Sequence, residues 1–533
     1  MSDFLWWRDG VIYQIYPRSF MDSNNDGIGD LPGITQKLDY LEDLGINAIW
    51  LSPVYPSPDK DFGYDVADYC DIDSKFGGMK AFDAFLKTTH EKGIKVMMDL
   101  VMNHTSDQHV WFQQSKSSTD NAYRDWYIWK SPGMNGKKPN NWQSRFGSSG
   151  WEWDANTQEY YFHMFFKQQP DLNWRNPKVF QAMMDQIKFW LDKGVDGFRL
   201  DVFNAFFKDE QFRNNPYQLG ITKFDQLQHI YDADQPEMFT FLREFRELLD
   251  SYPERYAVGE TFMGNYTTPA KYIGDKALHA AFEFSFLRSP YRASTFNKRI
   301  SRWENILEQK GWPNYVLNNH DVVRSASRYT RSEDDQRLKV LATLLLTLRG
   351  TPFMYYGEEI GMRDILISKK SDVLDPVGRY FWPFFKGRDG CRSPMQWNSE
   401  LNAGFSTART WLPVHPNHKW RNVESQEQDG NSLLNFYKQL LKMRRANESL
   451  QRGMYLPLTY EPKRLLAYLR QTSEQSSLVA LNFSKRKTGL VLGSQLLKGN
   501  WRLGISNKRD QFPEIRDRKI ILEENEALVL IQD

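Results

Sequence analysis

Two hydrophobic patterns alternate through most of the chain. Short runs rich in Val, Ile, Tyr and Phe predict β-strands, and longer stretches with apolar residues every three or four positions predict amphipathic helices. The predicted strands are residues 11–17, 48–53, 95–101, 197–202, 256–261, 279–284, 314–319 and 352–357. The predicted helices include residues 34–45, 81–93, 180–194 and 433–447. Eight strands alternating with helices predict an α/β fold, the TIM (β/α)8 barrel, whose active sites lie at the carboxyl ends of the strands.

Two connections are much longer than the loops usual in such a barrel. Residues 102–175, rich in Trp, Asn, Gly and Ser, follow the third strand and predict an inserted subdomain B over that end of the barrel. A second long insertion, at about residues 358–430, follows the eighth strand. From residue 455 to residue 533 short alternating strands predict a C-terminal antiparallel β-sandwich domain. The barrel itself is expected to comprise residues 1–101 and 176–454.

Three predicted strands lead directly into a carboxylate: Asp201, Glu260 and Asp321. Any one of them could cap a helix or pair with an arginine, and Arg199 lies two residues before Asp201 on the same face of its strand. An ionised carboxylate in a low-dielectric site must be paired or used chemically. Three such groups at strand ends therefore favour a catalytic site over a structural role.

The charge balance excludes several classes of partner. Lys and Arg number 69 against 67 Asp and Glu, a net charge near +2, and no basic run interleaved with aromatics is present. We therefore expect neither a nucleic-acid partner nor an anionic membrane. The apolar stretch 338–350 is too short to span a bilayer, and the first residues lack the pattern of a secretion signal. A soluble, cytoplasmic protein with no obligate protein partner is predicted.

Aromatic residues make up 15% of the chain, and its two cysteines are too few for a disulfide framework. Many aromatics fall in predicted loops, among them Trp142, Trp151, Trp153, Tyr160, Tyr161 and Trp382. Flat apolar faces beside polar groups are suited to stacking on sugar rings, although core packing also consumes aromatics. The composition is thus compatible with a carbohydrate ligand.

The residues at the strand ends form four blocks, DLVMNH (99–104), GFRLD (197–201), AVGE (257–260) and NNHD (318–321). In this order on a TIM barrel they resemble the α-amylase superfamily of glycoside hydrolases and transglycosidases (glycoside hydrolase family 13). The block QPDLN (169–173) is similar to that of the oligo-1,6-glucosidase and α-glucosidase branch. The resemblance covers nearly the whole chain, including the subdomain and the C-terminal β domain.

This resemblance implies a retaining mechanism carried by three acids. Asp201 matches the nucleophile that forms a glycosyl-enzyme intermediate, and Glu260 matches the general acid/base. Asp321 matches the third acid, which holds sugar hydroxyls and favours the oxocarbenium-like transition state. Glu260 must be protonated when substrate binds, which neighbouring negative charge favours by raising its pKa. Arg199 should keep Asp201 ionised and oriented.

The same resemblance implies the contacts that select the substrate. Asp61 and Arg392 would bind the far hydroxyls of a terminal glucose, while Tyr64 stacks on its ring; taken alone, both charges would be ordinary surface groups. His104 and His320 would donate hydrogen bonds to the sugar. Aromatic walls from subdomain B are expected at Phe146 and Phe165, with packing of the subdomain core as the alternative.

Linkage preference is expected to depend on Val202, which follows the nucleophile. In the branch this chain resembles, Val at this position tends to accompany α-1,6 activity and Thr α-1,4 activity. The resulting hypothesis is an exo-acting α-glucosidase that hydrolyses short α-glucosides from the non-reducing end, with α-1,6 activity. The alternatives are an α-1,4-preferring α-glucosidase, a transglucosidase or sucrose isomerase, and a trehalose-6-phosphate hydrolase. A non-catalytic family member is disfavoured because all three acids are present.

A possible ion site lies in residues 22–30, DSNNDGIGD, which begin like an EF-hand loop. Its oxygen donors would be Asp22, Asn24, Asp26, the Ile28 carbonyl and Asp30. The twelfth position is a glycine, so the bidentate glutamate of an EF-hand is missing. In related α-glucosidases this loop is a structural Ca²⁺ or Mg²⁺ site. The alternative is a polar turn closed by Asx hydrogen bonds.

Overall fold

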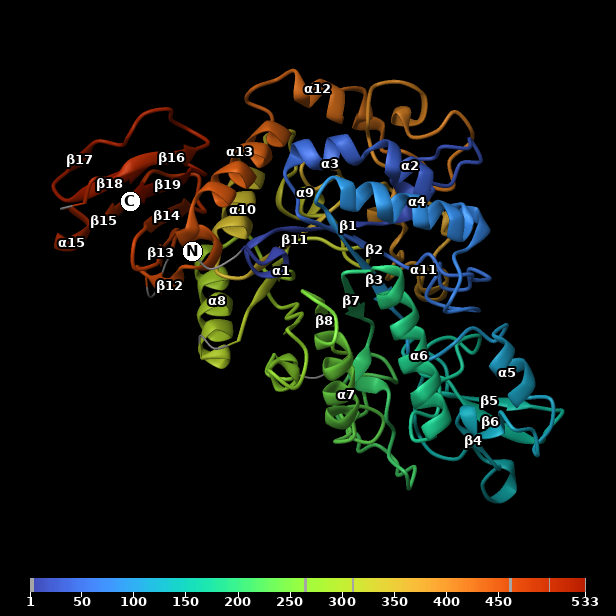
Figure 1. The fold of residues 1–533 in the computed structure, drawn as a ribbon. Helices are drawn as coiled ribbons and strands as arrows, with labels where there is room; N and C mark the ends of the chain where they lie inside the picture. The colour runs from blue at the N-terminus through green and yellow to red at the C-terminus, as the bar shows by residue number, and fades with distance from the viewer. Residues whose placement is uncertain (1–3, 263–265, 309–310, 460–462, 498, 533) are drawn as a thin grey trace.

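The computed structural model describes residues 4–262, 266–308, 311–459, 463–497 and 499–532. Within these residues eight parallel strands form one sheet in the order β10-β11-β1-β2-β3-β7-β8-β9 (Figure 1). The strands are β1 (Ile12–Ile15), β2 (Ala48–Leu51), β3 (Lys95–Leu100), β7 (Gly197–Leu200), β8 (Tyr256–Gly259), β9 (Ala280–Ala281), β10 (Asn314–Val316) and β11 (Thr351–Tyr355). Each predicted strand overlaps one of them, and the predicted barrel is confirmed.

The weakest part of the barrel is β9, which is two residues long although six were predicted. In the described part of the chain β9 pairs only with β8, so the sheet is nearly rather than fully closed. The run ends early because Ser285 donates from its amide (2.9 Å) and hydroxyl (2.6 Å) to the Glu283 carboxylate, which bends the backbone. Phe282 still packs inside the barrel, 4.9 Å from Phe353 between ring centroids.

Helices surround the strands, and their ends follow local sequence signals. They are α2 (Leu31–Gln36), α3 (Leu38–Leu44), α4 (Gly78–Glu91), α6 (Pro177–Lys193), α7 (Met238–Asp250), α8 (Ala293–Leu307), α9 (Ser325–Tyr329), α10 (Gln336–Thr347) and α13 (Leu433–Ala446). Asn176 caps α6, Pro177 opens it and Gly194 ends it with φ 102°. The predicted helix 34–45 is two helices, because Asp30 caps an earlier start and the chain breaks at Lys37.

Subdomain B contains a small antiparallel sheet, β4-β6-β5, and one short helix. Its elements are β4 (Trp129–Lys130), β5 (Trp151–Asp154), β6 (Glu159–Phe162) and α5 (Val110–Ser115). Trp142 and Trp151 are fully buried against Phe162, with ring centroids 5.3 Å apart in both pairs. Trp151 lies in β5 rather than in a loop, and core packing, the alternative to stacking on a sugar ring, accounts for the burial of both tryptophans.

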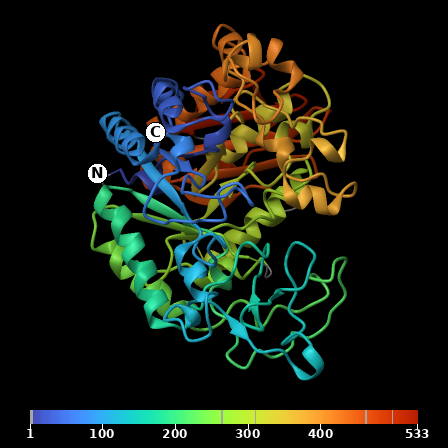
Figure 2. The ribbon, with the colours of Figure 1, turned by 90° about the vertical axis from the view of Figure 1, so that its right-hand side faces the viewer.

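The C-terminal part of the chain forms two packed sheets. The order in the described residues is β12-β13-β14-β19-β16 in one and β15-β18-β17 in the other. Their bounds are β12 (Met454–Pro457), β13 (Leu465–Gln471), β14 (Ser476–Asn482), β15 (Thr488–Val491), β16 (Arg502–Ser506), β17 (Ile515–Arg516), β18 (Lys519–Leu522) and β19 (Ala527–Gln532). Leu478 and Ile520 share an apolar cluster that joins the two sheets. Figures 1 and 2 place these sheets and subdomain B on opposite sides of the barrel.

Two buried arginines lie where the barrel meets the C-terminal sheets, and one of them, Arg470, makes hydrogen bonds from a C-terminal strand to the barrel. Arg444 of α13 donates to the carbonyl oxygens of Leu346 (3.0 Å) and Gly350 (2.9 Å). Arg470 of β13 donates to those of Thr347 (2.6 Å) and Gly453 (3.0 Å). Burial lowers the pKa of Arg444 to about 10 and that of Arg470 to about 9. Main-chain carbonyls, not carboxylates, thus stabilise both guanidinium groups.

The apolar stretch 338–350 falls largely within α10, which is buried on nearly every side. It contacts α13 and two strands of the C-terminal sheet, β14 and β19. Across the described ranges, no helix combines the length and the hydropathy needed to cross a membrane. This stretch is therefore part of the protein core.

Candidate active site

Arg199 lies at the centre of the carboxyl end of the barrel. It stands on β7 in register with Asp99 of β3, and its Nη1 contacts Oδ1 of Asp99 and Oδ1 of Asp201, both at 2.6 Å. Its Nη2 pairs with Glu260, which follows β8. Strand alternation directs these side chains to one point from three neighbouring strands. The predicted convergence of Asp201 and Glu260 is thus seen in the structure, with Asp99 as an additional acid.

The acids around Arg199 outnumber the positive charge that it carries. Burial, opposed by Arg199, raises the pKa of Asp201, and repulsion from Asp99 and Glu260 raises it further. Burial also raises the pKa of Glu260, again against Arg199, with repulsion from Asp321 and Asp99 adding to it. Burial and mutual repulsion thus both favour a state of the cluster in which one carboxyl keeps its proton. The cluster can therefore supply both an ionised and a protonated acid.

Asp321 has a different electrostatic environment. Its Oδ1 lies 3.1 Å from Nη2 of Arg392 and 3.5 Å from Nη1 of Arg388. Although burial opposes ionisation, the neighbouring guanidinium groups of Arg388 and Arg392 hold the pKa of Asp321 well below its usual range. Asp321 is consequently a fixed negative charge, unlike Asp201 and Glu260.

The structure pairs Asp61 with Arg388 rather than with Arg392. Nη2 of Arg388 lies 2.6 Å from Oδ1 of Asp61, and the same nitrogen lies 2.8 Å from Asp375. Arg392 is fully buried, and its Nε donates to the His320 carbonyl at 2.8 Å. Sequence reasoning missed Arg388, although it stands only four residues before Arg392 in the same excursion. The guanidinium adjacent to Asp61 therefore belongs to Arg388.

His320 and Tyr64 form a hydrogen-bonded chain inside the barrel. Gln14 Nε2 lies 2.8 Å from His320 Nδ1, and His320 Nε2 lies 2.7 Å from the Tyr64 hydroxyl, which donates to Asp99 at 3.1 Å. The rings of Tyr64 and His320 stack with centroids 5.4 Å apart. Burial lowers the pKa of His320 to about 3, so the ring is neutral and donates from Nε2. This network orders both predicted residues.

His104 joins the barrel to subdomain B. Its Nε2 lies 3.0 Å from the Tyr64 carbonyl and 3.1 Å from Gln169 Nε2, and burial lowers its pKa to about 4. Asp171 of the QPDLN block pairs with the buried Lys208 at 2.6 Å. Sequence reasoning gave no role to Gln169 or Lys208, whose partners come from distant segments. The QPDLN block thus holds subdomain B against the barrel.

The aromatic residues predicted to form walls pack together beside the acids. Phe165 lies 5.2 Å from the His104 ring, 5.6 Å from Phe146 and 5.1 Å from Phe262, measured between centroids. Phe165 is mostly buried in an apolar cluster that also contains Val202, whereas Phe146 is half-buried. These contacts show that core packing accounts for much of both side chains.

Val202 adopts an unusual backbone conformation directly after Asp201. Its φ is 38° and its ψ 34°, in the left-handed region that β-branched residues rarely adopt. Strain of this kind costs about 1–3 kcal/mol and is found preferentially at functional sites. Here it turns the chain sharply at the end of β7. Val202 therefore leaves the line of the strand and belongs to the apolar cluster that also contains Phe165.

Comparison with known proteins agrees with this geometry. Residues 14–453 match the family described as "Alpha amylase, catalytic domain". The chain belongs to the alpha-amylase family. A probable alpha-glucosidase of Rhizobium meliloti (strain 1021) is 42% identical over 499 residues, 90% of this chain and 89% of the relative. An oligo-1,6-glucosidase of Parageobacillus thermoglucosidasius is 40% identical over 558 residues, 96% and 97% of the two chains. The solved alpha-glucosyl transfer enzyme XgtA superposes with TM-score 0.93 at 39% identity over 100% of both chains.

Loop 22–30 of this alpha-amylase family member is closed by its own hydrogen bonds. Oδ1 of Asp22 accepts from the amides of Asn24 (3.1 Å) and Asn25 (2.8 Å), and Oδ2 from that of Gly27 (2.8 Å). Asp30 caps α2 at the Gly33 amide, 2.6 Å away. In the part of the chain that the structure describes, no group of three or more His, Cys, Asp and Glu side chains is arranged as a metal site. The polar-turn hydrogen bonds are thus present in the loop.

The donors of this loop nevertheless suit a hard cation. Asp22 and Asp30 are both buried, and neither forms an ion pair with a described basic side chain. Burial raises the pKa of Asp30, and the nearby Asp22 raises it further. A carboxylate has about four acceptor positions, so the turn hydrogen bonds leave capacity for an ion. Two buried, mutually repelling carboxylates would be stabilised by Ca²⁺.

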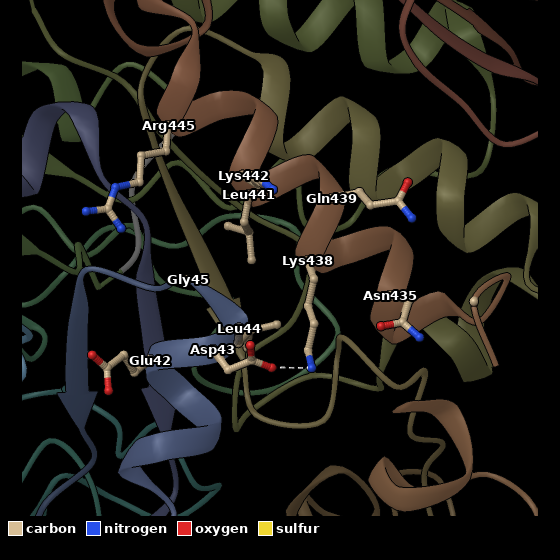
Figure 3. Close-up of a pocket in the computed structure, with 11 residues that line it drawn as sticks. Glu42, Asp43, Leu44, Gly45, Asn435, Lys438, Gln439, Leu441, Lys442 and Arg445 are labelled. Carbon is tan, nitrogen blue, oxygen red and sulfur yellow. Dashed lines mark hydrogen bonds and ion pairs between the residues drawn. The ribbon is translucent and has the colours of Figure 1, made fainter. Parts of the chain in front are cut away.

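A surface hollow of about 570 Å³ lies elsewhere, between α3 and α13 (Figure 3). Its charged residues include Lys438, which pairs with Asp43 at 2.5 Å, and Lys442. Gly45, which precedes β2, also lines it, so the hollow is on the side of the amino ends of the strands. It is therefore separate from the acids around Arg199.

Proposed function

We propose that this protein is a retaining, exo-acting α-glucosidase that hydrolyses short α-glucosides from the non-reducing end. The arrangement of Arg199, Asp201 and Glu260 carries the proposal. The two carboxylates bind adjacent nitrogens of one guanidinium. This favours the shorter separation of retaining glycosidases, about 5 Å, over that of inverting ones.

The proposed steps assign one role to each acid. Asp201 attacks the anomeric carbon while Glu260 donates its proton to the leaving oxygen, forming a glycosyl-enzyme intermediate. Glu260 then takes a proton from water as the water releases glucose. Asp321, held ionised by Arg388 and Arg392, accepts hydrogen bonds from sugar hydroxyls and stabilises the positive charge of the transition state.

Recognition of a chain end is assigned to Asp61, Arg388 and Tyr64. The Asp61–Arg388 pair presents a carboxylate and a guanidinium that suit vicinal hydroxyls. Asp375 fixes the far side of Arg388. Asp61→Ala should raise KM for maltose and isomaltose alike, because both end in the same glucose.

The test of the catalytic scheme is direct. Asp201→Ala and Glu260→Ala should each abolish hydrolysis of an aryl α-glucoside, measured as release of the aryl alcohol. Azide should restore turnover by Glu260→Ala, since a good leaving group needs no protonation and azide replaces the activated water. Activity retained by either variant without azide would exclude the scheme.

We propose α-1,6 preference on the basis of Val202, which follows Asp201 and belongs to the apolar cluster that contains Phe165 and packs against Phe262. Val202→Thr preserves the β-branched shape and adds a hydroxyl. The expected result is a lower ratio of isomaltose to maltose hydrolysis, measured as kcat/KM for each disaccharide. An unchanged ratio would show that Val202 does not determine the linkage preference.

Glucosyl transfer is the second candidate, because an alpha-glucosyl transfer enzyme shares the fold over the whole chain. Both activities use the same acids and differ in whether water or a sugar attacks the intermediate. Products formed from sucrose and from concentrated maltose would distinguish them. Trisaccharides or isomerised sucrose in excess over glucose would favour transfer.

We also propose that loop 22–30 binds one Ca²⁺, or Mg²⁺, with a structural role. Asp22, Asn24, Asp26, the Ile28 carbonyl and Asp30 would supply the oxygen ligands, and the bound ion would neutralise the two buried carboxylates. The acids at Arg199 lie on other strands, so the ion takes no part in the chemistry.

A further inference from the structure

A continuous path of contacts leads from loop 22–30 to the acids at the end of the barrel. The Gly27 carbonyl accepts from the amide of Trp411 at 3.0 Å. The indole N–H of Trp411 donates to the hydroxyl of Ser19 at 3.0 Å. That hydroxyl donates in turn to the carbonyl oxygen of Arg392 at 2.5 Å. These three hydrogen bonds therefore connect the loop to the main chain of Arg392.

Ser19 holds the Arg392 segment at two points. Besides the bond to Arg392, its carbonyl accepts from the amide of Met395 at 2.7 Å. The Ser19 side chain is fully buried, so no solvent competes for these bonds. The backbone around Arg392 is consequently fixed by Ser19.

The position of the Arg392 main chain determines where its guanidinium group lies in the site. Its guanidinium is fully buried and contacts Asp321 at 3.1 Å and the His320 carbonyl at 2.8 Å. A shift of its main chain would move the charge that holds Asp321 ionised. Misplacement of a catalytic group by about 1 Å can cost a factor of roughly 100 in rate.

The Trp411 ring gives the path a second, parallel connection. It lies 6.1 Å from Tyr16 and 5.6 Å from Phe62, and Tyr16 stacks on His320 at 6.1 Å, measured between centroids. The guanidinium of Arg18 lies 5.8 Å from the indole. Both connections therefore end at residues 320 and 321.

We propose that Ser19 and Trp411 are positioning residues that couple the order of loop 22–30 to Arg392 and so to Asp321. This rests on the proposed function of Asp321 as a charge that acts on the reacting sugar. Loosening the loop would lower the rate of the chemical step by displacing Asp321, while Asp201 and Glu260 stay paired with Arg199.

The experiment uses one variant at each end of the path. Gly27 has φ 89°, and a Cβ there would lie 2.1 Å from the Arg409 carbonyl, so Gly27→Ala must displace the loop from the Trp411 segment. Ser19→Ala removes the hydroxyl alone. Each should lower kcat for an aryl α-glucoside about tenfold, with KM changed by less than about twofold, because the lost contact acts in the transition state.

Two matched controls separate coupling from general destabilisation. Gly93 has φ 70° with nothing within 4 Å of a Cβ, so Gly93→Ala strains the backbone without displacing a neighbour. Trp190→Phe removes an indole bond to the Tyr69 carbonyl (2.7 Å), whereas Trp411→Phe removes the one to Ser19. The controls should lose stability and keep kcat, while Trp411→Phe should lose kcat.

Three results decide the proposal. The kcat losses of Gly27→Ala and Ser19→Ala should be non-additive in the double variant, since both break one path. Hydrogen exchange at the Met395 amide should be faster in Gly27→Ala than in Gly93→Ala. If Ser19→Ala keeps kcat while Asp321→Ala loses it, the coupling is refuted and the proposed function stands. If Asp321→Ala keeps activity, the proposed function falls as well.

Discussion

Buried arginines organise both the carboxyl end of the barrel and its boundary with the C-terminal sheets, yet their partners differ. Arg199 faces Asp99, Asp201 and Glu260, whose charges it only partly balances. Arg444 and Arg470 face main-chain carbonyls, which cannot titrate. Carboxylate partners raise or lower one another's pKa, whereas carbonyl partners leave a fixed charge. The first arrangement suits proton transfer, and the second holds two domains together.

Among the predicted changes, removal of Arg199 should have the largest effect, a loss of kcat. Arg199→Met leaves three clustered carboxylates, Asp99, Asp201 and Glu260, without their shared guanidinium, so they would retain more protons and Asp201 would lose its ionised form. We expect kcat to fall about 10²- to 10⁴-fold, the range associated with loss of acid–base control. Arg199→Lys, which keeps the charge but not the two-nitrogen geometry, should recover only part of it. The measurement is the pH profile of kcat for an aryl α-glucoside; a wild-type profile in Arg199→Met would contradict this account.

Removing Arg470 should reduce stability and spare catalysis. Arg470→Met leaves several buried carbonyls without a donor, and each costs about 1–3 kcal/mol. The free energy of unfolding should therefore fall by about 3 kcal/mol, measured by urea denaturation, with kcat unchanged in the folded protein. Lys519→Met, at an exposed position of β18 in the same domain, is the control and should have little effect. A large loss of kcat would show that the contact between the barrel and the C-terminal sheets also affects the geometry of the active site.

Glu358 is a buried acid whose hydrogen-bond donors are uncharged side chains instead of an arginine. It accepts hydrogen bonds from Asn318 and from the Tyr437 hydroxyl, and burial raises its pKa to about 7 from 4.5. Between these values the unfolded chain ionises while the folded protein keeps the proton. Stability should therefore fall as pH rises from 4.5 to 7, by roughly 3 kcal/mol, and stay level above that.

Glu358→Gln should remove this part of the pH dependence, because glutamine keeps the hydrogen bonds and carries no charge. Urea denaturation of both proteins at pH 5 and pH 8 provides the measurement. At pH 5 the two should differ little, and at pH 8 the variant should be the more stable. Equal slopes against pH would show that Glu358 is ionised in the folded protein at both values.

Removal of an ion from loop 22–30 should have the smallest effect on stability. It adds a third way of stabilising buried charge to the comparison, in which a bound cation replaces an arginine. Chelation should lower the melting temperature by a few degrees, since a ligand that binds only the folded state stabilises it by mass action. Asp22→Asn should lower it similarly and abolish the response to chelator. No response to chelator or to added Ca²⁺ in the wild type would favour the polar turn alone.

The strand-end acids could be predicted from the sequence because a strand places its last residue at a known edge of the barrel. Asp99 could also have been found, since it lies in β3 opposite Arg199 of β7, but it falls within the predicted run instead of at its end. Arg388 could not, because its contact with Asp61 joins segments 327 residues apart. Nor could the burial of Trp142 be predicted: its subdomain has strands of two to four residues, too short for a clear alternation.

The left-handed backbone of Val202 also bears on how this site can be altered by engineering. Glycine and asparagine adopt φ near 38° at little cost, so either would relieve strain that valine now stores beside Asp201. Substitutions here consequently change two properties at once, the free energy of folding and the packing of the apolar cluster that contains Phe165. A variant with changed linkage preference at this position should be compared with others of equal backbone strain, so that a gain in stability is not mistaken for a change in specificity.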